Sequence, residues 1–239
     1  TVLQLAPRKN FENMLKWFVE EFKDNDKVGL VVKAHMQNNS TLDFHSSKTI
    51  IKGLLDTISP NRKCKIYFVH GNFSEQEMAS LYNPEYIDCY VTTTHGEGFG
   101  IPIFNAACNK IPVIATNWSG HLDFLRAPVK SKTGKVKLQS HFLKVDYKLD
   151  KVQSQHIMPG LIVEGCEWAY PDETSFKKNL RFISNNKGSF LEEAHSLSTH
   201  LLDKYDIEKI KQKYKEFHQE HMGTIKTKTY NDISELDTL

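Results

Sequence analysis

Seven residues, "THGEGFG" at positions 94–100, place three glycines and one carboxylate in a single short stretch. The apolar run "IPIFNAAC" that follows predicts a helix, so the stretch lies where a loop meets a helix N-terminus. Free N–H groups at such an end, and glycines that let the backbone approach closely, favour a phosphate group. The spacing is not that of the dinucleotide fingerprint, and a glycine-rich turn can also serve only to connect a strand to a helix.

Glu97 narrows the chemistry of this stretch. A carboxylate beside a phosphate cradle repels the phosphate, so its presence suggests a neutral polyol nearby whose hydroxyls can donate to it. A phosphate and a polyol together describe a sugar nucleotide.

The elements that must position this stretch alternate between apolar strands and amphipathic helices. We expect strands at 2–5, 28–34, 65–69, 88–93 and 112–116, and helices at 11–22, 49–57, 74–82, after 100 and from 119. Strands that are apolar on both faces and separated by helices indicate an α/β fold with a doubly wound, mostly parallel sheet. In such a fold ligands bind beyond the carboxyl ends of the strands, where residues 94–100 lie.

The remainder of the chain is expected to be irregular in two places and helical at its end. The irregular segments are 37–46 and 129–160, the second with a small hairpin around Thr133 and Gly134. Helices are expected at 172–185, 190–205 and 207–221. The tail after Gly223 has no clear periodicity, so we predict one domain at 1–222 and a tail at 223–239.

The composition is that of an ordinary globular domain without a strong overall charge. Of 239 residues, 39% are hydrophobic and 25% are charged. The formal net charge is +2, from 31 basic and 29 acidic residues, so no global field recruits nucleic acid or an anionic membrane. No apolar run approaches the ~20 residues of a membrane span. Any phosphate site must therefore be local.

The cysteines and the first residues bear on the compartment. Cys64, Cys89, Cys108 and Cys166 form neither a CxxC pair nor a cluster with zinc spacing, which favours buried thiols in a reducing compartment. The opening "TVLQLAP" has no basic region and no cleavage site, so we expect a cytoplasmic protein. Because "VLQL" is typical of a buried strand, we also expect the sequence to begin at a domain boundary.

Four segments of the chain resemble one enzyme family. "HGEGFGIPIFNAACNKIPVIATNWSGHLDFL" closely resembles the EGFG-x-P signature, the PVIAT strand and the serine-glycine turn of the GT-B glycosyltransferases of family 4. "LAPRKNFENMLKWF" and "VHGNFSEQEMASLY" are similar to that family's first and third strand–helix units, and "EWAYPDETSFKKNLRFI" to its trp-ala-x-pro-asp segment. Together these segments cover about residues 2–185 in the family's order.

The resemblance implies a fold and a set of partners. In GT-B enzymes two Rossmann-like domains face each other, and the C-terminal one holds the nucleotide sugar. This chain resembles only that donor domain, with extra C-terminal helices. The implied partners are a nucleotide sugar, an acceptor-binding domain not present here, and a glycan or other hydroxyl acceptor, with no nucleic acid indicated.

The resemblance also implies roles for the glycine-rich stretch. Glu97 matches the glutamate that binds hydroxyls of the transferred sugar and helps to orient its anomeric carbon. The backbone amides expected to cradle the sugar and diphosphate are those of Gly98, Phe99, Gly100 and Ile101. The family's second glutamate, which binds the ribose, falls on Asn105, whose uncharged bond should be weaker by ~1 kcal/mol. The alternative for Asn105 is a helix-surface amide.

Basic side chains are implied beside the diphosphate. Arg8 and Lys9 match the pair that neutralises it, and fixed cations stabilise the charge that the leaving group gains. A solvated loop charge is the alternative for Arg8. Lys33, at the end of the second expected strand, is expected on the same rim, with a solvent-facing lysine as the alternative.

Four further residues are expected on this rim. The base should lie near the end of the third strand, where Phe73 is either a stacking platform or a core residue. Ser119 and Gly120 begin another helix and could bound the diphosphate pocket. His95 either touches the sugar or is a structural histidine.

Neither a metal nor a cofactor is expected. Asp24-Asn25-Asp26 has the Asp-x-Asp form that binds a divalent ion in the other large glycosyltransferase fold. Here it lies between a helix and a strand, away from the expected ligand rim, and is typical of a turn. The resemblance implies that basic side chains and helix dipoles take the metal's role.

The predicted function is that of a glycosyltransferase donor domain that moves a hexose from a nucleotide diphosphate to an acceptor hydroxyl with retention, and is poorly active alone. The alternative is a non-catalytic sugar-nucleotide-binding module, which Asn105 favours and which Glu97 and Lys9 oppose. A sugar-nucleotide epimerase shares the architecture but lacks the EGFG-x-P signature. The sequence leaves the sugar, the base and the acceptor open.

Overall fold

The structure, a computed structural model, describes residues 1–130, 133–186, 188 and 190–222. It divides into two units, Thr1–Leu201 and Leu202–Leu239. The tail predicted at 223–239 lies outside the described residues.

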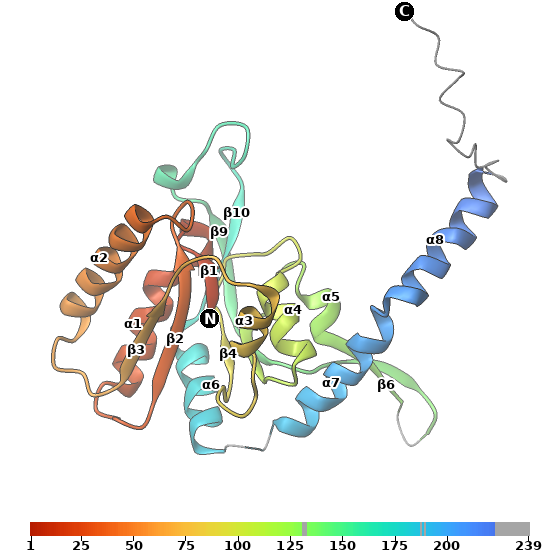
Figure 1. Cartoon of the computed structure of the whole chain (residues 1–239), viewed down its shortest axis with the longest axis horizontal. Coiled ribbons are helices and arrows are strands. Elements are labelled where there is room, and N and C mark those ends of the chain that lie inside the picture. The colour runs from red at the N-terminus through yellow and green to blue at the C-terminus, as the bar shows by residue number, and fades with distance from the viewer. Residues whose placement is uncertain (131–132, 187, 189, 223–239) are drawn as a thin grey trace, which may run out of the picture. The chain divides into compact units, whose positions relative to one another are not determined.

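Two three-stranded parallel sheets form the centre of the first unit (Figure 1). One sheet has the order β1-β2-β3, built from Val2–Gln4, Gly29–His35 and Lys65–Val69. The other has the order β4-β5-β8, built from Tyr90–Val91, Val113–Thr116 and Leu143–Val145. Every residue of β5 is buried, as expected for a strand covered on both faces. The predicted α/β class with mostly parallel strands is confirmed.

The two sheets are joined at the carboxyl ends of β1 and β4. The His95 N–H donates to the Arg8 carbonyl over 2.9 Å. The Asn10 side-chain amide donates to the Thr93 carbonyl over 3.1 Å. The loops that follow these two strands therefore lie together, although they are more than 80 residues apart in the sequence.

Helix α1 (Phe11–Phe22) shows why the sequence pattern predicts its position. The apolar residues at helical spacing are all buried, namely Phe11, Met14, Leu15, Phe18, Val19 and Phe22. The helix follows a short 3-10 turn, η1 (Pro7–Lys9), where Asn10 takes a φ of 52°. It packs against α2 (Thr41–Ile58) and α6 (Glu173–Asn185), with the Trp17 and Phe176 ring centroids 6.0 Å apart.

Apart from α2, the other helices lie close to the positions that the sequence pattern predicts. The capping box predicted from Ser74 and Glu77 is present at the start of α3 (Glu75–Ser80). The glycine-rich stretch leads into α4 (Ile101–Cys108), and α5 (Leu122–Leu125) starts three residues after Ser119. The C-terminal helices are α6, α7 (Leu191–Lys204) and α8 (Ile207–Met222), the last within the second unit.

The segment 37–46, predicted to be irregular, is largely the start of a helix. Helix α2 begins at Thr41, eight residues earlier than expected, because the Ser40 hydroxyl accepts the Asp43 N–H and caps it. This first turn of the helix is rich in polar residues, so its sequence lacks the apolar spacing that marks the later turns.

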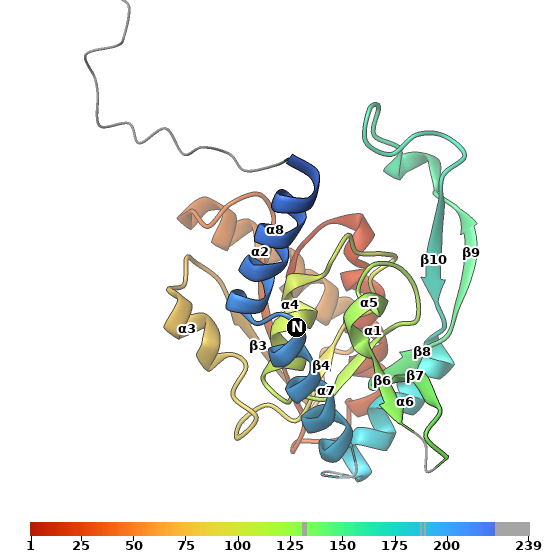
Figure 2. The ribbon, with the colours of Figure 1, turned by 90° about the vertical axis from the view of Figure 1, so that its right-hand side faces the viewer.

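The segment 129–160, also predicted to be irregular, is mostly β-structure. The hairpin predicted around Thr133 and Gly134 is confirmed as β6 (Arg126–Lys130) and β7 (Val136–Ser140). A second antiparallel ribbon follows, formed by β9 (Tyr147–Lys151) and β10 (Glu167–Pro171), with a longer connection that includes a 3-10 turn at Ser154–His156 (Figure 2). Both pairs are two-stranded, so neither offers the all-buried pattern that revealed the parallel strands.

A buried carboxylate fixes the loop between β2 and α2. The Asp43 carboxylate accepts the N–H groups of Met36 and Gln37 over 3.0 and 2.8 Å, and lies 2.9 Å from Nε2 of His70. Burial alone would raise the pKa of Asp43, but the hydrogen bonds from His70 and the backbone hold it well below its usual range.

Replacing Asp43 with asparagine should lower the thermal midpoint at neutral pH, and the gap to the wild type should narrow as the pH falls below about 4. A carboxyl group whose pKa is lower in the folded than in the unfolded state stabilises the folded protein at pH values above its unfolded-state pKa. This stabilisation is lost as the pH falls toward the folded-state pKa. Calorimetric scans from neutral pH to about pH 3 measure the gap, with the exposed Asp56→Asn on the same helix as the control. A gap that stays constant over this range would contradict the assignment.

Candidate functional site

The glycine-rich loop, residues 94–100, is held by the turn that follows β5. The Glu97 N–H donates to the Ser119 hydroxyl over 2.6 Å, and that hydroxyl donates to the Glu97 carbonyl over 3.0 Å. The Gly120 N–H donates to the same carbonyl over 3.1 Å. Ser119 and Gly120, predicted to bound the pocket, therefore clamp the loop through its backbone.

The glycines of this region have different structural roles. Among Gly96, Gly98 and Gly100, only Gly100 has a left-handed backbone, with a φ of 88°. A Cβ on Gly98 would meet nothing within 4 Å, so this backbone faces open space. A Cβ on Gly120 would lie 1.8 Å from the Gly98 carbonyl oxygen, which leaves room for no side chain. The sequence pattern led us to expect that all three glycines of the loop let the backbone turn and approach a ligand closely. A left-handed turn is present only at Gly100, and close packing excludes a side chain at Gly120.

The start of α4 offers hydrogen-bond donors. Within the described part of the chain, the backbone N–H groups of Gly100 and Ile101, and of Gly98 just before them, donate no hydrogen bond. Gly100 is the N-cap and provides no side-chain cap. Unsatisfied N–H groups at a helix start carry a partial positive charge, so this end of α4 suits an anion.

Glu97 lies between two cations. Its carboxylate oxygens are 2.6 Å from Nζ of Lys9 and 3.1 Å from Nη1 of Arg8, and Arg8 also donates to the Gly96 carbonyl. The Glu97 side chain is 10% exposed, against 17% for Lys9 and 42% for Arg8. Burial opposes ionisation of Glu97, but Lys9 and then Arg8 lower its pKa below the ordinary value. This Arg8–Lys9–Glu97 cluster thus carries a formal charge of +1.

The charge of the cluster corrects one step of the sequence argument. Glu97 alone would repel a phosphate, yet two neighbouring cations more than compensate its charge. The three side chains come from the loops after β1 and β4, whose joined carboxyl ends bring them together. A positive cluster beside the free donors of α4 can hold an anion, and Glu97 can accept from neutral donors.

His121 lies near enough to the cluster to feel the charges of Glu97 and Lys9. The sequence pattern did not identify it as a site residue. It is fully buried, and its Nε2 lies 2.7 Å from the Thr116 carbonyl at the end of β5. Burial lowers the pKa of His121, with the charges of Glu97 and Lys9 near enough to act on it in opposite directions. In the sequence, only its position directly after Ser119-Gly120 indicated that it lies near the site.

His95 is committed largely to packing. Its Nδ1 lies 2.8 Å from the Ala169 carbonyl of β10, and its ring stacks on Trp168 with the centroids 4.9 Å apart. Burial lowers the pKa of this histidine. His95 therefore anchors the β9–β10 ribbon next to the glycine-rich loop, and a contact with a sugar stays a prediction.

Lys33 and Phe73 lie together. Nζ of Lys33 donates to the Gly71 carbonyl over 3.0 Å and lies 5.0 Å from the centroid of the Phe73 ring. Lys33 lies within β2 rather than at its end and is 7% exposed, so it is not a solvent-facing lysine. Burial lowers its pKa. No hydrogen bond or ion pair in the described part of the chain links this pair to the Arg8–Lys9–Glu97 cluster.

The remaining predicted residues lie on or near α4. The Phe99 ring packs against Phe104 and Phe124, with centroids 5.3 and 4.9 Å away, so its side chain contributes to packing at the edge of the hydrophobic core. Ile101 is 65% exposed, and Asn105 is half-buried one turn further along the helix. Roles for their backbone or side chains in ligand binding stay predictions.

No metal site is visible among the described residues. They contain no group of three His, Cys, Asp or Glu side chains arranged to hold a metal ion. Asp24 and Asp26 lie between α1 and β2, where the Asn25 side chain accepts the Lys27 N–H in a local turn.

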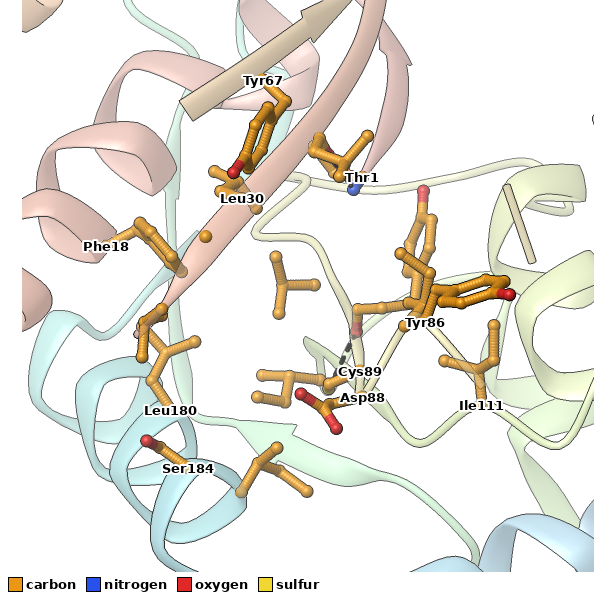
Figure 3. A pocket seen from close by; sticks show the side chains of 18 of the residues that line it. Thr1, Phe18, Leu30, Tyr67, Tyr86, Asp88, Cys89, Ile111, Leu180 and Ser184 are labelled. Atoms are coloured by element: carbon orange, nitrogen blue, oxygen red, sulfur yellow. Dashed lines mark hydrogen bonds between the residues drawn. The ribbon is translucent and has the colours of Figure 1, made fainter. Parts of the chain in front are cut away.

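The described part of the first unit also contains a cavity of about 450 Å³ that is separate from the cluster. It lies between the amino ends of β2 and β4, with Leu30 and Tyr67 on one side and Asp88 and Cys89 on the other (Figure 3). Neither Lys9 nor Glu97 lines it. Burial raises the pKa of the Cys89 thiol to about 12, so this cysteine is no nucleophile.

Comparison with known proteins decides the family. The profile described as "Glycosyl transferases group 1" matches residues 1–134, which include the cluster, the glycine-rich loop and the Ser119-Gly120 turn. The chain belongs to this family. Its first unit thus carries the group 1 glycosyltransferase signature on the same residues that form the site.

Solved structures with a similar fold are also glycosyltransferases. The C-terminal domain of a group 1 glycosyl transferase from Francisella tularensis is 14% identical, with a TM-score of 0.56 over 86% of this chain and 85% of that one. A glycosyltransferase from Rickettsia africae is 12% identical, with a TM-score of 0.59 over 94% and 48%. An α,α-trehalose-phosphate synthase (UDP-forming) from Burkholderia xenovorans, in complex with glucose-6-phosphate, is 11% identical, with a TM-score of 0.59 over 91% and 42%.

These likenesses establish the fold of this group 1 glycosyltransferase chain. The chain spans less than half the length of the Rickettsia and Burkholderia structures but most of the Francisella C-terminal domain. It therefore has the fold of the C-terminal domain of a GT-B glycosyltransferase. No curated protein matches it in sequence.

Proposed function

We propose that this chain is the donor-binding domain of a retaining family 4 glycosyltransferase. It binds a nucleotide-diphosphate sugar and, with an acceptor-binding domain, transfers a hexose to the hydroxyl of a glycan or other acceptor. The observation that carries the proposal is the Arg8–Lys9–Glu97 cluster beside the free N–H donors of α4.

The cluster divides the work between charge and hydrogen bonding. Lys9 and Arg8, with the N–H groups at the start of α4, bind the diphosphate and stabilise the charge that it gains as the sugar leaves. Glu97 then accepts hydrogen bonds from sugar hydroxyls, which also orients the anomeric carbon. Basic side chains and helix donors take the role of a metal, so the reaction needs no cofactor.

The binding of the nucleotide follows from the same arrangement. Lys33 of β2 and Phe73, which follows β3, form a cationic and aromatic pair suited to the base or ribose, and Asn105 supplies an uncharged acceptor on α4. The Burkholderia neighbour is by name UDP-forming, which supports a nucleoside diphosphate as the leaving group. All four cysteines are free, which fits the reducing cytoplasm.

A module that binds a sugar nucleotide without transferring it is the second candidate. Asn105 in place of a ribose-binding carboxylate favours it, whereas the complete Arg8–Lys9–Glu97 cluster favours transfer. Supplying the acceptor-binding domain and measuring sugar transfer separates the two, because a pure binding module stays inactive in that assay.

Titration calorimetry with a panel of nucleoside diphosphates and their sugars tests the proposal. Lys9→Gln should weaken binding of the preferred diphosphate by about tenfold, since a charge-assisted contact contributes ~1.5 kcal/mol or more. Lys16→Gln, on the exposed side of α1, is the matched control and should leave the affinity unchanged. Failure of the whole panel to bind, or equal losses in both variants, would overturn the proposal.

A further inference from the structure

Positive charge is concentrated in one stretch of the sequence. Residues 124–145 contain six cations and no acid, namely Arg126, Lys130, Lys132, Lys135, Lys137 and Lys144. The whole chain has a net charge of +2, so the remainder carries −4. The weak global field therefore conceals a strongly basic segment, which includes the β6–β7 hairpin.

The β6–β7 hairpin, whose strands are labelled in Figure 2, presents apolar side chains next to these charges. In its register Lys130 pairs with Val136 and Pro128 with Leu138, so these four residues share one face. Val136 and Leu138 are 65% and 66% exposed. Lys137 lies on the opposite face, and Lys135 precedes the strand. An exposed aliphatic face flanked by lysines is unusual for a hairpin whose only neighbour is water.

The base of the β6–β7 hairpin is packed against the rest of the first unit, whereas its outer part is exposed and can contact a partner. Ala127 is buried, and the His141 ring just after β7 lies 2.7 Å from the Glu193 carboxylate of α7. In the described part of the chain, Lys130, Lys135 and Lys137 make no ion pair. Their charges are therefore not neutralised by the fold itself.

The lysines and the exposed aliphatic side chains together indicate which class of partner the hairpin binds. Nucleic acid would use the lysines, but a phosphate backbone gains little from valine and leucine, and the hairpin offers no aromatic ring for base stacking. An anionic bilayer uses both features, because lysines are drawn to its surface charge while aliphatic side chains enter the interfacial region. None of the helices in the described part of the chain is both long and apolar enough to cross a bilayer, so any attachment through this region is peripheral.

We propose that the β6–β7 hairpin binds the surface of an anionic phospholipid membrane, with Val136 and Leu138 in the interface and Lys130, Lys135 and Lys137 against the headgroups. The hairpin follows α5, which in turn follows the Ser119-Gly120 turn of the candidate site. Binding at this hairpin would hold the candidate site close to a membrane surface. The proposal rests on charge and exposure and does not depend on the donor.

Flotation of the full chain with vesicles tests the proposal. The wild type should partition to mixed phosphatidylcholine–phosphatidylglycerol vesicles, ignore pure phosphatidylcholine and dissociate as salt rises. Lys135→Gln with Lys137→Gln should weaken partitioning by roughly twentyfold, about fivefold for each charge. Lys52→Gln with Lys178→Gln, two exposed helix lysines, removes the same charge elsewhere and should have little effect.

Three results would overturn the proposal. They are equal binding to charged and neutral vesicles, equal losses in the two double variants, and tighter binding to a single-stranded RNA oligonucleotide than to the charged vesicles. Leu138→Thr keeps the strand propensity and should leave a weaker binding that salt abolishes completely. The lipid and salt comparisons use the wild type alone, so they decide the matter even if a hairpin variant folds poorly.

Discussion

Replacing Glu97 with glutamine should tighten the binding of a bare nucleoside diphosphate by about tenfold, whereas its nucleotide sugar, which gains the same relief of charge but loses hydroxyl hydrogen bonds to the carboxylate, should bind no more tightly than to the wild type. The two ligands respond differently because Glu97 acts on the two parts of the donor in opposite ways. Its carboxylate lies 2.6 Å from Nζ of Lys9 and 3.1 Å from Nη1 of Arg8. A diphosphate must compete with it for the same cations.

The gain for the diphosphate follows from charge. Glutamine is nearly the same size as glutamate but carries no charge, so the cluster changes from +1 to +2. Removing a like charge a few ångströms from the phosphate is worth about 1–2 kcal/mol in this partly buried site. The loss for the sugar follows from hydrogen bonding, since a neutral amide accepts hydroxyl protons less strongly than a carboxylate and offers one oxygen instead of two.

Calorimetry with one nucleoside diphosphate and its sugar measures both effects in a single pair of titrations. Glu12→Gln removes the same charge from the exposed start of α1 and is the matched control. If Glu97→Gln weakened both ligands equally, the residue would serve only to position Lys9 and Arg8. That result would remove the sugar-binding role while leaving the diphosphate role intact.

Elements that depend on local residues could be predicted from the sequence. The apolar spacing of α1 and the capping box of α3 are local properties, and both are present in the structure. The start of α2 and the β9–β10 ribbon could not be predicted in this way. A polar first turn has no apolar spacing, and a two-stranded ribbon does not need the continuous apolar pattern of a covered strand.

The arrangement of the candidate site was even less predictable from local sequence than the secondary structure. Residue types and the family resemblance indicated Glu97, Lys9 and Arg8, but not that one carboxylate pairs with both cations across 88 and 89 residues of sequence. The pairing depends on the joined ends of β1 and β4, which is a property of the assembled sheets. His121 and the Asp43–His70 pair depend in the same way on contacts between distant segments or on burial, which leave no periodic signal.

Replacing Gly120 with alanine should lower the free energy of unfolding by about 3 kcal/mol, near the upper end for overpacking, and abolish donor binding. The added Cβ would lie 1.8 Å from the oxygen and 2.7 Å from the carbon of the Gly98 carbonyl, and 2.9 Å from the Glu97 oxygen. These are backbone atoms, so no side-chain rotation can relieve the clash. The glycine-rich loop must move away, and the bonds from Ser119 and Gly120 to Glu97 are then broken.

Gly98→Ala is the matched control because its Cβ would meet nothing within 4 Å and its backbone is not left-handed. The two alanines should separate stability from binding. Gly120→Ala should reduce the thermal midpoint by roughly 6–12 °C, whereas Gly98→Ala should melt like the wild type and lose affinity only because a methyl group enters the space of the ligand. An unchanged midpoint for Gly120→Ala would mean that the loop is not clamped by this turn. Full donor affinity in Gly98→Ala would place the diphosphate elsewhere on the rim.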